Sequence, residues 1–244
     1  MSTGWPSRVF WKEVTVAPAG GEGDGWTVAL DGRPLRTPAR RRLTLPTEAL
    51  AEMVAREWRA LEERIDPARL PATRLANAAI DRVSAERAAV IDHLAGYGAS
   101  DLLCYRATHP AELAARQAAA WGPLLEWAAA AHGARLHVTS GVMPVRQPPE
   151  ALAALRAPLE ALDDFALAAS HDLVTLSGSL VLGLAVLAGR LRPDEAWALS
   201  RIDEDWQQEQ WGIDAEAARR TEHRRGEFMT AARILAALGI VSEE

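Results

Sequence analysis

Cysteine and lysine are almost absent from this chain of 244 residues. Cys104 is the single cysteine, so no disulfide can form within the chain, and a lone thiol is typical of a reducing compartment. Lys12 is the single lysine among 27 basic residues. With 49% hydrophobic residues over this length, the core is large enough to need no disulfide or metal for stability.

An excess of positive charge is also missing. The formal net charge is −6, which provides no overall basic field for nucleic acid or an anionic membrane. The N-terminus shows no apolar run and no arginine-rich leader, so we expect no targeting segment and a bacterial cytoplasmic location. Residues 173–189 carry no charge, and the length of this run is at the lower limit for a membrane span. Their glycines and serines favour a buried helix instead, without stable membrane insertion.

The motifs of common enzymes are lacking as well. The glycine-rich run at 20–25 has no phosphate-binding lysine and precedes a strand pattern, which indicates a hairpin loop. The sequence at 177–179, Ser-Gly-Ser, is not a nucleophile elbow, and the nearby His171 does not make it a triad. The histidines and Cys104 show no metal-binding spacing. We therefore expect no catalytic residues, no cofactor and no metal.

Strand patterns fill the first 46 residues. Residues 9–16 and 26–30 are rich in β-branched and aromatic side chains, and residues 43–45 predict a short third strand. Asp31-Gly32 is a tight-turn signal between them. A helix is predicted over residues 47–63, with Thr47 as its N-cap. Its apolar stripe consists of Leu50, Met53, Val54, Trp58 and Leu61.

From about residue 70 the composition changes to alanine and leucine at helical spacing. Helices are predicted over residues 73–95, 110–131, 149–162, 170–190, 193–211 and 214–238. The expected class is therefore α+β. A small N-terminal α/β domain of antiparallel strands and a helix occupies residues 1–70, and a mostly helical C-terminal domain of the orthogonal-bundle type occupies residues 71–244. Residues 134–146 contain the one strand-like run of this half, which can pair back onto the N-terminal sheet.

Five arginines cluster near the turns of the N-terminal domain: Arg33, Arg36, Arg40, Arg41 and Arg42. Solvated turn charge is the simpler explanation. The functional alternative is a docking site for an acidic partner. An RNA-binding module is less favoured, because the chain is net negative and no aromatic platform lies nearby in the sequence.

The predicted helix at 193–211 carries an unusual distribution of aromatic and acidic side chains. One side forms a core stripe of Leu199, Ile202, Trp206 and Ile213. The opposite side carries Trp197, Glu204, Gln208 and Trp211. Two explanations stay open: the helix is buried on both sides within a bundle, or the second side is a partner-binding face with aromatic anchors around a central acid. The acids point in several directions, which disfavours a metal site or paired-carboxylate catalysis.

At this point the sequence resembles a known family, the F1-ATPase assembly factors that chaperone its α subunit (the mitochondrial ATP synthase F1 assembly factor 2 family and its α-proteobacterial relatives). The resemblance runs from about Phe10 to Gly239 and depends on the order and spacing of several blocks. They are "LDGRPLRTP" at 30–38, "LTLPTEALAEMVAREW" at 43–58, "LPATRLANAAIDRV" at 70–83, "DLLCYRA" at 101–107, "WGPLLEWA" at 121–128, "GSLVLGLA" at 178–185 and "LSRIDEDWQQEQWG" at 199–212.

This resemblance implies a small N-terminal α/β domain, a mostly helical C-terminal domain and a chaperone without catalytic activity. It implies binding of the free F1 α subunit, which would prevent its aggregation before it joins the β subunit. The family's functionally important acid maps onto Glu204, and Gln207, Trp211 and Gly212 match the pattern around it. We expect a monomer when free. The expected partner-binding residues are Trp197, Glu204, Gln207, Gln208 and Trp211.

A rival hypothesis is an enzyme with a carboxylate pocket between the two domains. Its candidate residues are Asp203, Glu204 and His171. Converging acids in a concave pocket would favour the enzyme, whereas exposed Trp197 and Trp211 would favour the chaperone.

Overall fold

The computed structural model describes residues 8–20 and 25–242. The chain divides into two compact units. The first comprises Met1–Arg87, Asp163–Ala169 and Arg233–Glu243, and the second comprises Ala88–Leu162 and Ser170–Ala232. The predicted class is confirmed: a small region of strands with a helix is followed by a largely helical remainder. Most of the glycine-rich run at 20–25 lies outside the described residues.

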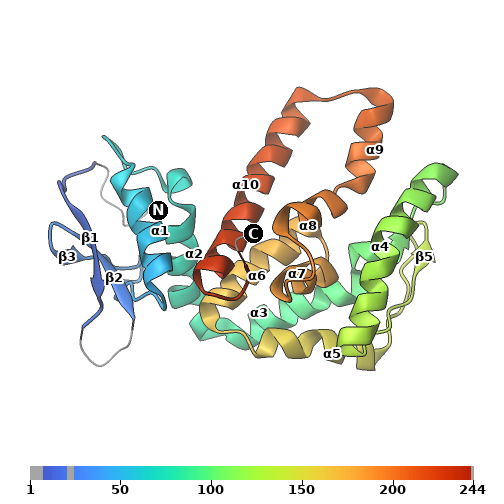
Figure 1. The fold of residues 1–244 in the computed structure, drawn as a ribbon, viewed down its shortest axis with the longest axis horizontal. Helices are drawn as coiled ribbons and strands as arrows, with labels where there is room; N and C mark the ends of the chain where they lie inside the picture. Colours follow the sequence, from blue (N-terminus) through green and yellow to red (C-terminus); the bar gives the residue numbers. More distant parts are fainter. Residues whose placement is uncertain (1–7, 21–24, 243–244) are drawn as a thin grey trace. The chain divides into compact units, whose positions relative to one another are not determined.

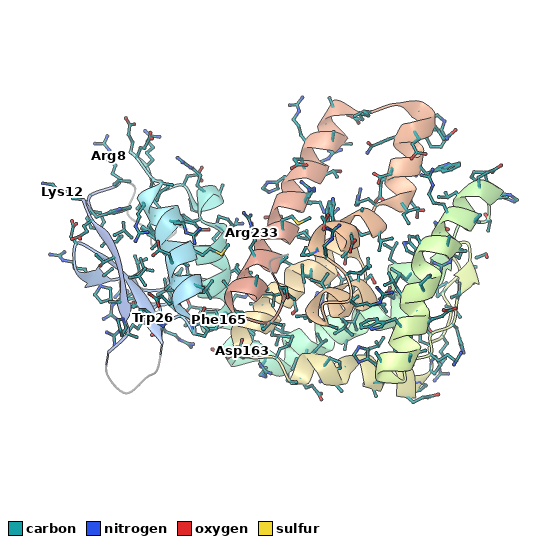
Figure 2. All side chains as sticks on the ribbon, viewed as in Figure 1. Arg8, Lys12, Trp26, Asp163, Phe165 and Arg233 are labelled. Carbon is teal, nitrogen blue, oxygen red and sulfur yellow. The ribbon has the colours of Figure 1, made fainter. Side chains whose placement is uncertain are left out.

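The first unit contains a three-stranded antiparallel sheet in the order β1-β2-β3. Its strands are β1 (Val14–Pro18), β2 (Trp26–Leu30) and β3 (Arg33–Pro34). The turn between β2 and β3 is the predicted one, and both of its residues have a positive φ (46° at Asp31 and 76° at Gly32). Asp31 also accepts hydrogen bonds from the backbone N–H groups of Lys12 and Glu13. Lys12 is labelled in Figure 2.

The predicted third strand at 43–45 was wrong. Within this segment the described structure has one isolated bridge, between Trp26 and Leu45, and the preceding Arg42 forms another with Arg36. Proline has no N–H to donate, and prolines close to the segment limit the length of the ladder. The side chains of Leu43 and Leu45 are nevertheless buried, so the segment contributes to the core.

Helix α1 (Glu48–Arg59) packs on β1 and β2 (Figure 1). The Thr47 hydroxyl accepts from the Leu50 N–H, as the N-cap prediction requires. The predicted stripe is confirmed at four positions, whereas Met53 is half-buried. The first unit also contains the short helix at Pro67–Arg69, α2 (Pro71–Ala78) and the π-helical turn at Ala79–Val83.

The second unit is built from helices. Those before residue 164 are α3 (Ser84–Gly96), two short turns at Tyr97–Ser100 and Leu102–Cys104, α4 (Ala111–His132) and α5 (Pro149–Glu160). Those after it are α6 (Asp164–Ser177), α7 (Leu180–Leu187), α8 (Pro193–Leu199), α9 (Ile202–Trp211) and α10 (Ala215–Ala237). Helices α3, α6 and α10 each contribute residues to both units.

Strand β5 (Thr139–Ser140) pairs in parallel with β4 (Tyr105–Arg106). The expected pairing of residues 134–146 with the N-terminal sheet was therefore wrong. The backbone groups of this segment are instead used within the second unit, where a hydrogen bond from the Gly141 N–H to the Arg106 carbonyl extends the pairing with β4.

The single helix predicted over 170–190 is two helices, α6 and α7. Gly178 between them has a φ of 74°, in the left-handed region that favours glycine. The Ser179 hydroxyl then caps α7 by accepting from the Leu182 N–H. Residues 180–186 of α7 are all buried, which confirms the buried-helix interpretation of this uncharged run. None of the helices in the described part of the chain combines the length and apolar character of a membrane span.

The helix predicted over 193–211 is also two helices, α8 and α9. They separate at Ser200 and Arg201, where the backbone of Arg201 has a φ of −111° and a ψ of 7°. The Ser200 hydroxyl donates to the Trp197 carbonyl at 2.6 Å, a local bond that competes with the continuation of the helix. The side-chain faces predicted for one continuous helix are therefore interrupted between Trp197 and Glu204.

Candidate partner-binding site

Helix α9 and the first half of α10 form an arm of the second unit, which we define as residues 202–227. In Figure 1 the two helices extend away from α7 and α8, and the turn that joins them lies at the far end. Ile202 is the only buried residue of the arm, all of which the structure describes. Side chains project from both of its helices in Figure 2. The side chains of the arm are therefore mostly accessible to solvent.

Two large apolar side chains are exposed where α9 ends. Trp211, the last residue of α9, is 80% exposed, and Ile213 in the turn is 73% exposed. Gly212 between them has a φ of 88°, which ends the helix. Ile213 was expected in the core stripe, and that expectation was wrong, because the chain turns away from the unit before reaching it. Adjacent exposed apolar side chains of this size are typical of an interaction surface.

Glu204 lies on α9 and forms an ion pair with Arg201 at 2.9 Å. The Arg201 side chain is 14% exposed, and its guanidinium carbon lies 5.7 Å from the centre of the Trp197 ring. The Trp197 ring in turn lies 5.4 Å from that of Phe228 on α10. This chain of contacts connects the Glu204 carboxylate to the hydrophobic core at the base of the arm.

Trp197 does not belong to the exposed surface. Its side chain is only 6% exposed, so of the two tryptophans whose exposure would favour the chaperone, only Trp211 is exposed. The break at Ser200 accounts for the difference, because it removes Trp197 from the helix that carries Glu204. Of the other two predicted residues, Gln207 is exposed and Gln208 is half-buried.

Asp203 holds α9 against the rest of the unit. Its carboxylate accepts a hydrogen bond from the Nε2 of Gln117 on α4. Gln117 is 1% exposed, and its Oε1 accepts from the Ala107 N–H at 2.6 Å. A buried amide with both ends bonded fixes the position of the helix that carries Asp203.

A second connection between α4 and α9 lies nearer the end of the arm. Arg116 forms two hydrogen bonds to the Glu209 carboxylate, at 2.8 and 3.0 Å. The same guanidinium lies 4.9 Å from the centre of the Trp206 ring, a cation–π distance. The hydrogen bond from Arg116 lowers the pKa of Glu209, whereas partial burial raises the pKa of Asp205. Three of the four acids of α9 therefore have defined partners, and each has a different one.

The residues of the rival enzyme hypothesis have separate partners. His171 contacts the neighbouring Asp172 at 3.2 Å and stacks on His93, with 5.7 Å between ring centres. Asp203 is bonded to Gln117, and Glu204 to Arg201. Within residues 8–20 and 25–242, no group of three or more His, Cys, Asp or Glu side chains could hold a metal ion. The acids of α9 thus do not converge on one reacting atom.

Sequence reasoning missed two residues of this site, Arg201 and Ile213. Arg201 immediately precedes the acidic run, so its pairing at i, i+3 with Glu204 was available as a helical-spacing signal. Ile213 follows a glycine, which should have ended the helical stripe before it.

Three comparisons with known proteins agree with one another. The family model described as ATP12 chaperone protein matches residues 8–129. The mitochondrial protein atp12 of Schizosaccharomyces pombe is 28% identical over 217 residues, which cover 84% of this chain and 74% of that protein.

Solved structures extend the similarity over almost the whole chain. Atp12 from Paracoccus denitrificans is 48% identical, with a TM-score of 0.89 over 95% of this chain and 98% of that chain. A mutant of the same protein matches with the same identity and TM-score and covers 97% of its own chain. A protein from Agrobacterium tumefaciens is 44% identical, with a TM-score of 0.90 over 95% of this chain and 86% of that chain.

Proposed function

The chain belongs to the ATP12 chaperone family, and we propose that it chaperones the free α subunit of the F1 sector of ATP synthase. In this role it binds the α subunit before the β subunit does, and so prevents aggregation of the α subunit. The observation that supports this most is the pair of exposed apolar side chains, Trp211 and Ile213, at the end of a polar arm. The proposal includes no catalysis and no cofactor, and a monomeric free chain in the bacterial cytoplasm.

The physical task fits such an arm. A subunit made before its neighbour exposes apolar surface that is later covered, and such a surface is an aggregation hazard. A chaperone has to cover this surface and still release it when the neighbour arrives. A few aromatic anchors among polar side chains give a contact of moderate size and strength, which suits exchange better than a large apolar interface.

Glu204 has two roles in this proposal. Its Oε1 holds Arg201, and 43% of its side chain remains exposed to meet a donor on the α subunit. Gln207 and Gln208 add hydrogen-bonding groups around the Trp211 anchor. Trp197 acts from inside, as the buried ring on which Arg201 lies.

The test is co-expression with the F1 α subunit, measured as the fraction of α that stays soluble and elutes with the chaperone. The wild-type chain is expected to keep α soluble, whereas Trp211→Ala and Glu204→Lys are expected to lose most of this activity. Glu160→Lys is the matched control, because Glu160 is 53% exposed and paired with Arg156 at 2.7 Å on α5. The proposal is wrong if no variant differs from the wild type, or if the wild type itself leaves α insoluble.

A further inference from the structure

The first unit carries a cleft that the arm does not use. Its volume is about 240 Å³, and its lining comes from residues between Phe10 and Thr73. Buried Leu30, Leu43 and Trp58 form its floor, and the exposed Phe10 contributes to its rim. Every lining residue belongs to the first unit.

The polar groups beneath the cleft are already bonded to one another. The Trp58 Nε1 donates to the Thr73 hydroxyl at 3.1 Å, and that hydroxyl donates to Glu57 at 2.7 Å. The Thr37 hydroxyl donates to Asp81 at 2.8 Å. The floor therefore presents apolar surface and no convergent hydrogen-bonding groups of the kind that orient a cofactor. A volume below the range of about 300–1,000 Å³ for drug-sized ligands fits one or two apolar side chains.

The rim is strongly basic. Arg33 and Arg36 line the cleft and are exposed, and neither forms an ion pair with any residue that the structure describes. Arg36 donates to the carbonyl of Arg40, which places a third exposed arginine beside it. The neighbouring Arg41 forms an ion pair with Asp81, with 4.0 Å between its Nε and the carboxylate. Asp31, in the turn before Arg33, interacts with it electrostatically, so two acids face this rim. The arginines still outnumber these acids, and the rim has an excess of positive charge although the chain as a whole is negative.

We propose that this cleft binds an extended acidic peptide segment of a partner protein, with a large apolar side chain of the segment seated between Phe10 and Trp58. The carboxylates that flank this side chain pair with Arg33 and Arg36, in the manner of acidic-motif recognition by arginine clusters. The site goes beyond the role of the arm, because it uses other residues, another unit and another chemistry. It also assigns a role in binding to the arginines near the turns of this unit, which could otherwise be explained as solvated surface charge.

The experiment measures binding of a fluorescein-labelled peptide, Gly-Asp-Glu-Leu-Phe-Asp-Glu-Gly, to the full-length chain by fluorescence anisotropy. Two comparison peptides carry lysine in place of the acids, or serine in place of leucine and phenylalanine. The acidic peptide is expected to bind, both comparison peptides to bind at least about tenfold more weakly, and added salt to weaken binding. The double variant Arg33→Glu/Arg36→Glu is expected to bind the acidic peptide at least about tenfold more weakly.

Further variants distinguish binding in this cleft from binding elsewhere on the chain. Arg64→Glu reverses an exposed charge of the same unit outside the cleft and should bind as the wild type does. Phe10→Ala should weaken binding, whereas Met143→Ala should not; Met143 is an apolar residue of the other unit and is 74% exposed, against 60% for Phe10. Trp211→Ala should also bind the peptide normally, so that failure of the arm and failure of the cleft are distinguishable.

Amide chemical shifts give a second readout that does not depend on the variants. In the wild-type chain, the peptide is expected to shift the N–H signals of Leu35, Arg36 and Thr37. The proposal is overturned if the double variant binds as tightly as the wild type, if the shifts lie elsewhere, or if the lysine peptide binds better. It is equally overturned if a single-stranded oligonucleotide binds at this rim and the acidic peptide does not.

Discussion

The Glu204 carboxylate and the Arg201 guanidinium form an ion pair of 2.9 Å in which the acid is 43% exposed and the arginine only 14%. The Arg201 Nε is buried and has no hydrogen-bond partner in the described structure. Glu204 therefore balances a nearly buried cation while it still faces solvent. Removing the acid leaves this cation with only its longer-range interaction with Asp205, which costs more than the loss of an ordinary surface pair.

Glu204→Lys is expected to lower the free energy of unfolding by about 1–2 kcal/mol, because it adds a second cation beside Arg201. Glu204→Gln should cost about 1 kcal/mol or less, since the amide can still accept a hydrogen bond from the arginine. Urea denaturation of both variants and of Glu160→Lys measures this difference. A loss above about 4 kcal/mol for Glu204→Lys would make the acid a structural residue, and its loss of partner binding would then be uninformative.

Periodicity predicted the parts of the fold in which one helix has one buried face. The stripe of α1 was correct because Thr47 caps the helix and Leu50, Val54 and Trp58 pack on the sheet. Periodicity failed at Ser200, because no proline or glycine marks the break there and a serine side chain terminates α8 through a local bond. At Gly178 the signal was present, since a glycine followed by a capping serine ends one helix and starts the next.

The candidate site was predictable in part for the same reason. The sequence left open whether the face with Glu204 and Trp211 is buried or exposed, and the structure leaves Glu204 43% and Trp211 80% exposed on helix α9. The burial of Trp197 on Phe228 depends on contact between α8 and α10, which no spacing within one helix reveals. The cleft beside Arg33 and Arg36 needs the third dimension as well, because its floor joins strand, loop and helix residues.

Stability between pH 4 and pH 6 is expected to depend on Asp101. This acid is fully buried, and burial raises its pKa to about 6 despite hydrogen bonds from the Ser179 hydroxyl and the Val181 N–H. Because the folded-state pKa exceeds the unfolded value, the protonated acid stabilises the fold below about pH 4. This contribution, about 3 kcal/mol, is lost as the pH rises through about 6.

The measurement compares the free energy of unfolding of the wild type and Asp101→Asn from pH 4 to pH 8. The variant is expected to be less stable at low pH. Its amide N–H₂ group cannot accept the hydrogen bonds that the Ser179 hydroxyl and the Val181 N–H donate to the acid. The difference between the two proteins should narrow as the pH rises through 6 and then stay constant. A difference that widens over this window would contradict the raised pKa.

The thiol of Cys104 is expected to be unreactive in the folded protein. Its side chain is fully buried, and burial together with the nearby Asp101 raises its pKa to about 12. The thiolate that reacts with iodoacetamide is therefore scarce and shielded at pH 8. Mass spectrometry should detect labelling only after addition of denaturant, and rapid labelling of the native chain would show that this region opens easily.

Gly183 on α7 is expected to accept a side chain only at a cost in stability. An added Cβ would lie 2.7 Å from the Cγ2 of Val174, which is almost completely buried and has no room to move. Gly183→Ala should therefore destabilise the protein by about 1–3 kcal/mol. Gly122→Ala is the matched control, since Gly122 lies within α4 and its added Cβ meets nothing within 4 Å. That change should be neutral or stabilise by up to about 1 kcal/mol in thermal or urea unfolding. Equal effects at the two glycines would show that helix α7 can shift away from Val174.

Binding of the F1 α subunit by the end of the arm is the proposed function. Its most direct measurement is the affinity of the purified chain for the isolated α subunit, by analytical ultracentrifugation, for the wild type and for Trp211→Ala/Ile213→Ala. We predict a one-to-one complex with the wild type and at least about tenfold weaker binding by the double variant, which corresponds to about 1.4 kcal/mol. Its unfolding free energy should be unchanged, because both side chains are exposed. Equal affinity of the two proteins for the α subunit would contradict the account.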